Sequence, residues 1–196
     1  SLPRVFSTML SFCQWLQATA FFTALRGSAL VYPTILSLHM IGIAFFGAMI
    51  LVTDLRLLGV AMKSYPITDV VDRLRTPKRV GLTIMIVCGV LLFSTKAEEY
   101  YYNVFFQAKM ALLALVFVHA LVFGKSVYGQ AAEMDKSGIT GQAKTAAALS
   151  LILWIGLAIC GRGIGYIEPP LDKIHAFLTP HSFAGPATPA IQDLHE

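Results

Sequence analysis

Charged residues are scarce in this chain. Only 13% of its 196 residues are Asp, Glu, Lys or Arg, whereas 56% are hydrophobic, and a globular domain carries about 25% charged residues. The shortage argues against a soluble enzyme and for an integral membrane protein. The net charge of +4 is small and forms no basic stripe, so the composition indicates no nucleic-acid partner.

The chain also has few cysteines and lacks the short motifs that carry common chemistry. Cys13, Cys88 and Cys160 are far apart and form neither CxxC nor CxxCH, so neither zinc nor covalently attached haem is indicated. The sequence contains no HExxH, no glycine-rich phosphate loop and no nucleophile–base pair, which makes catalysis by side chains alone unexpected.

What the chain does have is long apolar runs. The clearest extends from Leu30 to Val52, holds one ionisable residue, His39, and ends at Asp54. About 20 apolar residues cross the hydrocarbon core of a bilayer as a helix. The runs together predict an all-α, integral membrane four-helix bundle over residues 29–162, with spans at roughly 30–53, 80–96, 104–124 and 145–161.

The segments that flank the bundle differ from it in composition. Residues 1–28 are moderately apolar and interrupted by Gln14 and Gln17, which predicts an amphipathic helix lying in the membrane interface, with a fifth span as the alternative. Residues 163–196 contain five prolines, which exclude one long helix and predict an extended C-terminal tail.

The basic residues predict the orientation in the membrane. Loops 54–79 and 125–144 together carry nine Lys and Arg, and the remaining segments carry six. The side richer in Lys and Arg is the cytoplasmic one. We therefore expect a multi-pass protein of a bacterial inner membrane with both termini on the periplasmic side.

Two histidines, His39 and His119, lie inside predicted spans. An ionisable residue in a span indicates function by default, and two imidazoles on different helices are the minimum for holding a b-type haem at both axial positions. If Tyr32 and Lys109 mark one interface, the histidines differ in depth by about 5 Å. If Tyr102 marks it, the difference is roughly 15 Å, which one haem could not bridge.

Three cations, Lys96, Lys109 and Arg162, are predicted at the same end of the bundle as His39. Haem propionates require such partners, because charge-assisted hydrogen bonds to Lys or Arg are strong. The alternative is that these side chains extend from helix ends into the interface without a ligand.

Each histidine also has an alternative without haem. His39 could bond to Thr83, Ser94 or a backbone carbonyl of a neighbouring helix, or relay protons, and His119 could bond to a Ser or Thr. His175 is an alternative second haem ligand, and the tail histidines together form a loose candidate for a surface metal site.

Two charged residues follow the C-terminal end of the first span. Asp54 and Arg56 are two residues apart and do not share a helical face in mid-helix. We expect them to pair with other helices in an ion network that pins the first loop.

Three blocks of the sequence carry a resemblance: LHMIGIAFFGAMILVTDLRLLG, GLTIMIVCGVLLFSTKAEEYYYNVFFQAKMALL and LWIGLAICGRGIGYI. The chain resembles, over roughly residues 10–167, uncharacterised bacterial four-helix inner-membrane proteins known only as a domain of unknown function. The LHxxG…DLRLLG block is the most specific. The resemblance implies a fold and no established activity, and it implies Asn more often than His at position 119. It places at family-typical positions His39, Asp54, Arg56, Lys109 and Arg162.

The leading hypothesis is a membrane electron-transfer subunit that binds b-type haem. His39 and His119 would be the axial ligands, with Lys109 and Arg162 at the propionates. The alternative is a cofactor-free accessory subunit that packs against other membrane-protein subunits. A small transporter or metal-handling protein is a weaker third hypothesis, because the spans hold few polar groups that would form a path.

Overall fold

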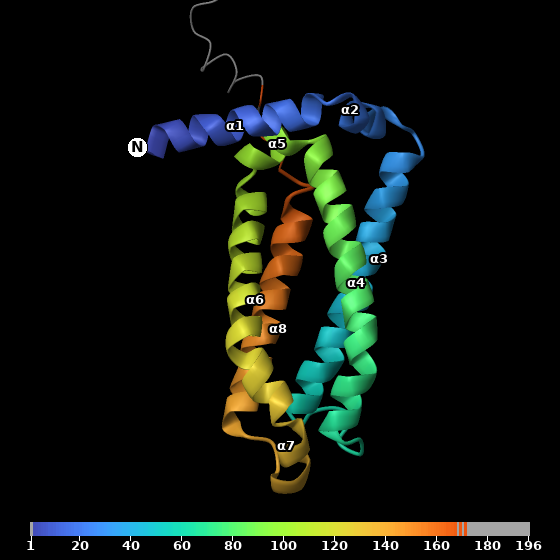
Figure 1. Ribbon diagram of the computed structural model, residues 1–196, viewed down its shortest axis with the longest axis vertical. Coiled ribbons are helices and arrows are strands. Elements are labelled where there is room, and N and C mark those ends of the chain that lie inside the picture. The colour runs from blue at the N-terminus through green and yellow to red at the C-terminus, as the bar shows by residue number, and fades with distance from the viewer. Residues whose placement is uncertain (1, 168, 170, 172–196) are drawn as a thin grey trace, which may run out of the picture.

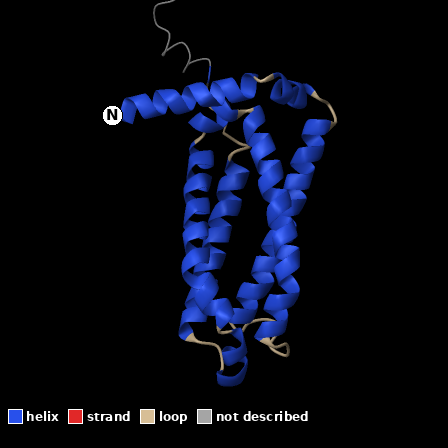
Figure 2. Ribbon diagram, viewed as in Figure 1, coloured by secondary structure: helices blue, strands red, loops and turns tan. Residues whose placement is uncertain are grey.

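Every regular element in the described part of the chain is a helix (Figure 2). The computed structural model describes residues 2–167, 169 and 171. Four of its helices are long and apolar enough to cross a membrane, which confirms the predicted all-α fold with four spans; most of the predicted tail lies outside the described residues. In chain order the helices are α1 (Leu2–Ala18), α2 (Ala20–Gly27), α3 (Val31–Leu57), α4 (Ile67–Thr95), α5 (Ala97–Tyr102), α6 (Val104–Gly129), α7 (Ala131–Ser137) and α8 (Gly141–Gly163).

The four long helices extend beyond the apolar runs that predicted them. The largest difference is in α4, which begins at Ile67, whereas the predicted span begins at residue 80. Pro77 lies inside this helix, where its missing N–H removes one backbone hydrogen bond without ending the helix. Hydropathy marks only the lipid-facing length of a helix, so the predicted span did not include the polar first turns of α4.

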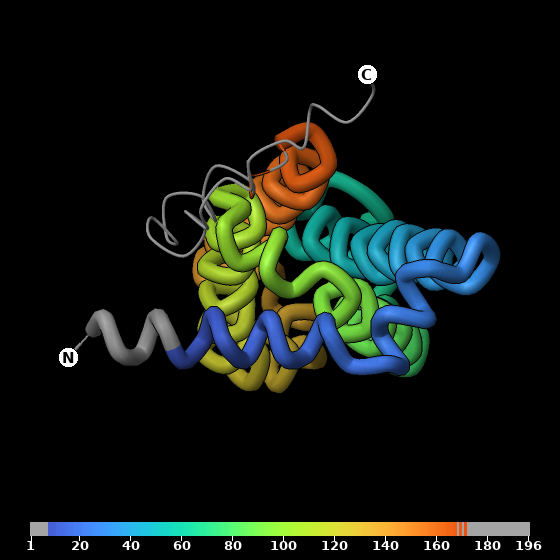
Figure 3. The backbone as a smooth tube through the Cα atoms, turned by 90° about the horizontal axis from the view of Figure 1, so that it is seen from above, coloured from blue at the N-terminus to red at the C-terminus, as the bar shows by residue number. Residues whose placement is uncertain are grey.

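Short helices cover both ends of the bundle. At the α5 end, α1 and α2 lie across the long helices, and α1 contacts α5 (Figures 1 and 3). At the opposite end, the α7 end, α7 connects α6 to α8 and packs against α4. The bundle therefore has two chemically separate ends, and its polar side chains gather at both.

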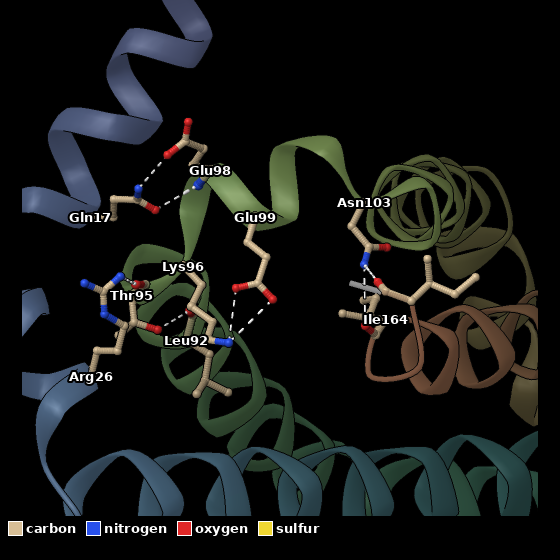
Figure 4. Close-up of polar contacts among 10 residues, drawn as sticks. Gln17, Arg26, Leu92, Thr95, Lys96, Glu98, Glu99, Asn103 and Ile164 are labelled. Atoms are coloured by element: carbon tan, nitrogen blue, oxygen red, sulfur yellow. Dashed lines mark hydrogen bonds and ion pairs between the residues drawn. The ribbon is translucent and has the colours of Figure 1, made fainter. Parts of the chain in front are cut away.

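The helix α1 turns its polar side toward the bundle. Gln14 and Gln17 donate hydrogen bonds of 2.8 and 3.0 Å to the two carboxylate oxygens of Glu98. Figure 4 shows the contact between Gln17 and Glu98. Phe12 and Trp15 are exposed, with ring centroids 5.9 Å apart. Exposed aromatic side chains suit the headgroup region of a bilayer, so α1 has the amphipathic character that the sequence predicts.

Glycines bring α3 and α4 close together. A Cβ atom at Gly42 would lie 3.3 Å from the Met85 backbone nitrogen, and a Cβ atom at Gly81 would lie 3.2 Å from the Phe46 Cβ. Small residues at crossings let helix backbones approach, which favours association inside a bilayer. Since α6 packs on α8 and α8 on α3, the bundle consists of two helix pairs joined through α3 and α8 (Figure 3).

The continuous buried core lies at the α7 end. It forms where the last turns of α3 and α6 meet the first turns of α4 and α8, with α7 closing the end. Alanines on α8 let that helix approach its neighbours closely. The buried members are Leu57, Ile67, Val71, Val127, Ala131, Met134, Ala143, Ala146 and Ala147.

The first turn of α4 is capped by a side chain from α7. Asp135 accepts hydrogen bonds from the Ile67 N–H, from the Thr68 N–H at 3.1 Å and from the Thr68 hydroxyl at 2.7 Å. The first N–H groups of a helix lack partners, and its dipole favours a negative charge there. Burial alone would raise the pKa of Asp135, but these hydrogen bonds outweigh it and hold the pKa below its ordinary value.

Candidate functional site

The imidazole of His39 lies between α3 and α4 with one ring nitrogen bound. Its Nδ1 is 3.0 Å from the backbone carbonyl oxygen of Met85. A carbonyl only accepts, so Nδ1 carries the hydrogen, and in the neutral ring Nε2 presents a lone pair. This is the bond to a backbone carbonyl that the sequence offered as one alternative. The same arrangement orients histidines that ligate metals.

Gly89 makes room for this ring on α4. A Cβ atom at Gly89 would lie 3.1 Å from His39 Cε1 and 3.9 Å from Nε2. Gly89 follows Met85 by four residues, so both lie on the same face of α4. No sequence motif marks Gly89, although its spacing of eight residues from Gly81 is consistent with a helix face of small residues along α4.

Lys109 lies near the start of α6 and is half-buried. Within the described part of the chain its ammonium forms no hydrogen bond or ion pair, and its charge acts on His39. A cation in a span is costly unless it has a partner or reaches the interface. The structure thus brings Lys109 into electrostatic range of His39 and leaves its charge without a partner among the described residues.

Three stacked aromatic rings join α4 to α6 at the α5 end. The centroids of Phe93, Tyr100 and Phe106 are 5.1 to 6.3 Å apart, with interplanar angles of 11° to 19°. Tyr100 also hydrogen-bonds with Tyr32 of α3, and burial is the main reason why the pKa of its phenol is raised. Lys109 follows Phe106 by one turn of α6, so the ring stack and the lysine share a helix face.

His119 is held by a different pair of helices. Its Nε2 is 2.9 Å from the Ala146 carbonyl oxygen of α8, so its partner is a backbone carbonyl and not the Ser or Thr that the sequence offered as one alternative. His39 follows the start of α3 by eight residues and His119 follows the start of α6 by fifteen. His119 therefore lies seven residues further along α6 than His39 lies along α3. No hydrogen bond or ring contact between described residues joins the two histidines.

Lys96 and Arg162 have partners of their own. The Lys96 Nζ is 3.1 Å from Glu99 Oε2 (Figure 4). Arg162 is exposed, donates a 2.8 Å hydrogen bond to the Tyr166 hydroxyl, and lies 4.8 Å from the centroid of that ring. Among the three predicted cations, Lys109 is the one whose charge has no partner in the described chain.

Asn103 and Arg26 connect the elements of this end (Figure 4). The buried Asn103 caps α6 by accepting from the Phe106 N–H at 3.1 Å, and its amide donates to the carbonyl oxygen of Ile167 at 2.7 Å. Arg26 of α2 donates to the Thr95 carbonyl oxygen at 3.3 Å. These bonds hold the ends of α2, α4, α6 and α8 together around the ring stack.

Asp54 and Arg56 do not pair with each other. The Arg56 Nε donates a 2.9 Å hydrogen bond to the Tyr65 carbonyl oxygen and so pins the loop between α3 and α4. Asp54 interacts with Ser150 and with the charge of Lys78 on other helices. The predicted pinning of the first loop therefore comes from Arg56 through a backbone acceptor, and sequence reasoning missed the partners of Asp54.

The remaining candidates for metal binding are simple to place. The three cysteines are free thiols. Within residues 2–167, 169 and 171, no three or more His, Cys, Asp or Glu side chains are grouped to hold a metal ion. The tail histidines, His175 among them, lie outside the described residues, so their suggested roles stay predictions.

Four apolar helices of spanning length, joined through small residues, define a multi-pass α-helical membrane protein. The chain belongs to the Family of unknown function (DUF6644), whose model matches residues 12–167, from the middle of α1 to just past α8. No curated protein matches the chain, and no solved structure matches it. Its function therefore has to be argued from the side chains themselves.

Proposed function

We propose that the protein is a membrane electron-transfer subunit that binds b-type haem, with His39 as an axial ligand through Nε2. One observation carries the proposal. His39 has an Nε2 lone pair, Lys109 has a charge without a partner among the described residues, and the two interact electrostatically within an apolar bundle. A b-type haem needs an imidazole nitrogen at iron, and its propionates need cations.

The surroundings of His39 suit such a ligand. The Met85 carbonyl holds the ring in the tautomer that frees Nε2, which is the usual second contact of a ligating histidine. Gly89 and the stacked Phe93 and Phe106 give the region an apolar lining. When bound, haem would supply one-electron redox chemistry, at a potential that depends on its ligands and burial.

The second axial ligand is part of the proposal. His119 would have to release the Ala146 carbonyl and turn to reach an iron held by His39, and His175 is the alternative. Lys109 would pair with one propionate, and the exposed Arg162 would pair with the other by leaving Tyr166. The protein itself would bind, orient and shield the group from water.

We also propose the cellular setting. The α7 end carries the loops richest in Lys and Arg, so it would face the cytoplasm of a bacterial inner membrane. The α5 end, with His39, would face the periplasm, and we propose the same side for both termini.

A cofactor-free accessory subunit is the second candidate. Its support is the exposed apolar side of α1 and α2, where Phe12, Trp15 and Phe21 are each more than half exposed. Such residues could pack against another membrane subunit as well as against lipid. This candidate predicts a colourless protein that purifies together with partners.

The test is the absorption spectrum of detergent-purified protein, expressed with ample haem and recorded before and after dithionite. We expect a Soret band and sharp reduced α and β bands that His39→Ala removes. His119→Ala should keep the haem and change its ligation spectrum if His119 is the second ligand; an unchanged spectrum points to His175. A featureless wild-type spectrum would sink the haem proposal and favour the accessory subunit.

A further inference from the structure

Asp54 is a carboxylate buried at the α7 end of the bundle, on the far side from the stacked rings. Asp54 is 4% exposed, and its buried Oδ2 has no hydrogen-bond partner among the described residues. An ionised carboxylate in this state is costly, because burial disfavours the charge and an unsatisfied oxygen adds to the cost. A group that binds Oδ2 would therefore lower the free energy of the folded bundle.

Polar groups from three other helices face Asp54. The Ser150 hydroxyl of α8 hydrogen-bonds to the carboxylate, and Lys78 of α4 acts on it through its charge. Tyr128 of α6 also interacts electrostatically with Asp54. In the described chain, Lys78 and Tyr128 are the titratable groups that interact with this carboxylate, and one of them is a cation.

Lys78 is a neighbour of Asp54 and not its ion-pair partner. Its Nζ donates a 2.7 Å hydrogen bond to the hydroxyl of Thr53, which is 1% exposed, and lies 5.5 Å from the Tyr128 ring centroid. No nitrogen–oxygen contact of 4.0 Å or less joins Lys78 to Asp54 within the described residues. The cation is thus held by its own partners, close to a carboxylate that it does not satisfy.

We propose that Asp54 is a proton-binding site and that Oδ2 is the atom that takes the proton. In the protonated state an Oδ2–H bond has formed with a proton taken from a hydronium ion, which leaves water, and Ser150 still interacts with the carboxyl group. In the ionised state the nearby charge of Lys78 balances the carboxylate. The two states differ by one proton and require no movement of the helices.

A proton fits this site better than a metal ion or an anion does. Alkaline-earth cations require several oxygen ligands, and no group of three or more metal-ligating side chains occurs among the described residues. The Lys78 ammonium would repel a cation, and the Asp54 carboxylate would repel an anion. Carboxyl groups within membrane helices commonly take part in proton transfer.

The test is infrared difference spectroscopy of the full-length protein in detergent as the pH is changed. We expect a carboxylic-acid C=O band that shifts in D₂O and is lost in Asp54→Asn. Asp72→Asn is the matched control, because Asp72 is exposed and pairs with Arg75 on the same helix, and it should keep the band. Lys78→Met should extend the band to higher pH, since a stabilising positive charge has been removed.

A second variant keeps the proposal testable if Asp54→Asn fails to fold. Ser150→Ala removes only the hydroxyl that bonds to Asp54, so it should shift the frequency of the band. No acid band at any pH at which the protein stays folded, or a band that neither Lys78→Met nor Ser150→Ala alters, would overturn the proposal. The measurement needs no haem, so this site and the haem site succeed or fail independently.

Discussion

The two ends of the bundle are held together in different ways. At the α7 end, side chains from five helices form a buried core, and Asp135 ties α7 to α4. At the α5 end, hydrogen bonds and stacked rings join α1, α5, α6 and α8. Close packing resists changes of shape, whereas a single hydrogen bond contributes about 1 kcal/mol. We therefore expect the α7 end, called the base below, to be the more rigid of the two and the α5 end to adjust more readily around His39.

Overpacking the base should have the largest effect on stability. Ala147 is 1% exposed in the core, so Ala147→Leu should lower the free energy of unfolding by about 1–3 kcal/mol. Ala158→Leu on the exposed side of α8 is the control and should change little. The measurement is the midpoint of unfolding in mixed micelles, and equal effects at both positions would contradict a packed base.

Removing Glu98 should loosen the α5 end without unfolding the bundle. Glu98→Ala deletes the acceptors of Gln14 and Gln17, so hydrogen exchange in α1 should speed up about tenfold, the equivalent of about 1.4 kcal/mol. Glu99→Ala, which removes the partner of Lys96, should leave α1 protected. If Glu98→Ala lowers the global unfolding midpoint as much as Ala147→Leu, the two ends are not distinct.

Deleting the cap on α4 should have a smaller effect. Asp135→Ala leaves the Ile67 and Thr68 N–H groups without their acceptor and should cost about 1 kcal/mol, as other helix caps do. Glu133→Ala on the same short helix is the control, because its exposed side chain caps nothing in α4. Indistinguishable unfolding midpoints for the two variants would show that the cap adds nothing to the base.

The smallest expected effect is the dependence of this cap on pH. The pKa of Asp135 in the folded state lies below its ordinary value of 3.8. The charged cap therefore contributes stability above that value, and the contribution is lost as the pH falls through the folded-state pKa. The unfolding midpoints of wild type and Asp135→Asn should converge as the pH falls below about 4, and a gap that persists in acid would mean that the charge is irrelevant.

The spans were predictable because apolar runs of this length can be buried only in lipid. The continuation of α4 through its polar first turns and Pro77 into the span was not predictable from apolar runs alone. From the sequence, a backbone carbonyl could be proposed as one partner of His39. The sequence did not show that this carbonyl belongs to Met85. Which turn of α4 faces His39 depends on the close approach at Gly42 and Gly81, a property of the folded pair.

The partners of Asp54 were harder to foresee. In the sequence, Lys78 is one of several basic residues between the first two spans, and Ser150 lies within an apolar run. Both meet Asp54 only because α4 and α8 pack on α3 at the same height. Contacts between distant segments depend on packing that a linear pattern does not contain.

The cap that Asp135 provides also orders events during synthesis. The ribosome delivers residue 67 well before residue 135, and folding proceeds from the N-terminus as the chain emerges. Until α7 has been made, the first N–H groups of α4 lack the Asp135 acceptor. During that time the pair of helices α3 and α4 is held together by the close contacts at its glycines. We therefore expect the α7 end of the bundle to close late, once α6, α7 and α8 have been made and Asp135 can bind the start of α4.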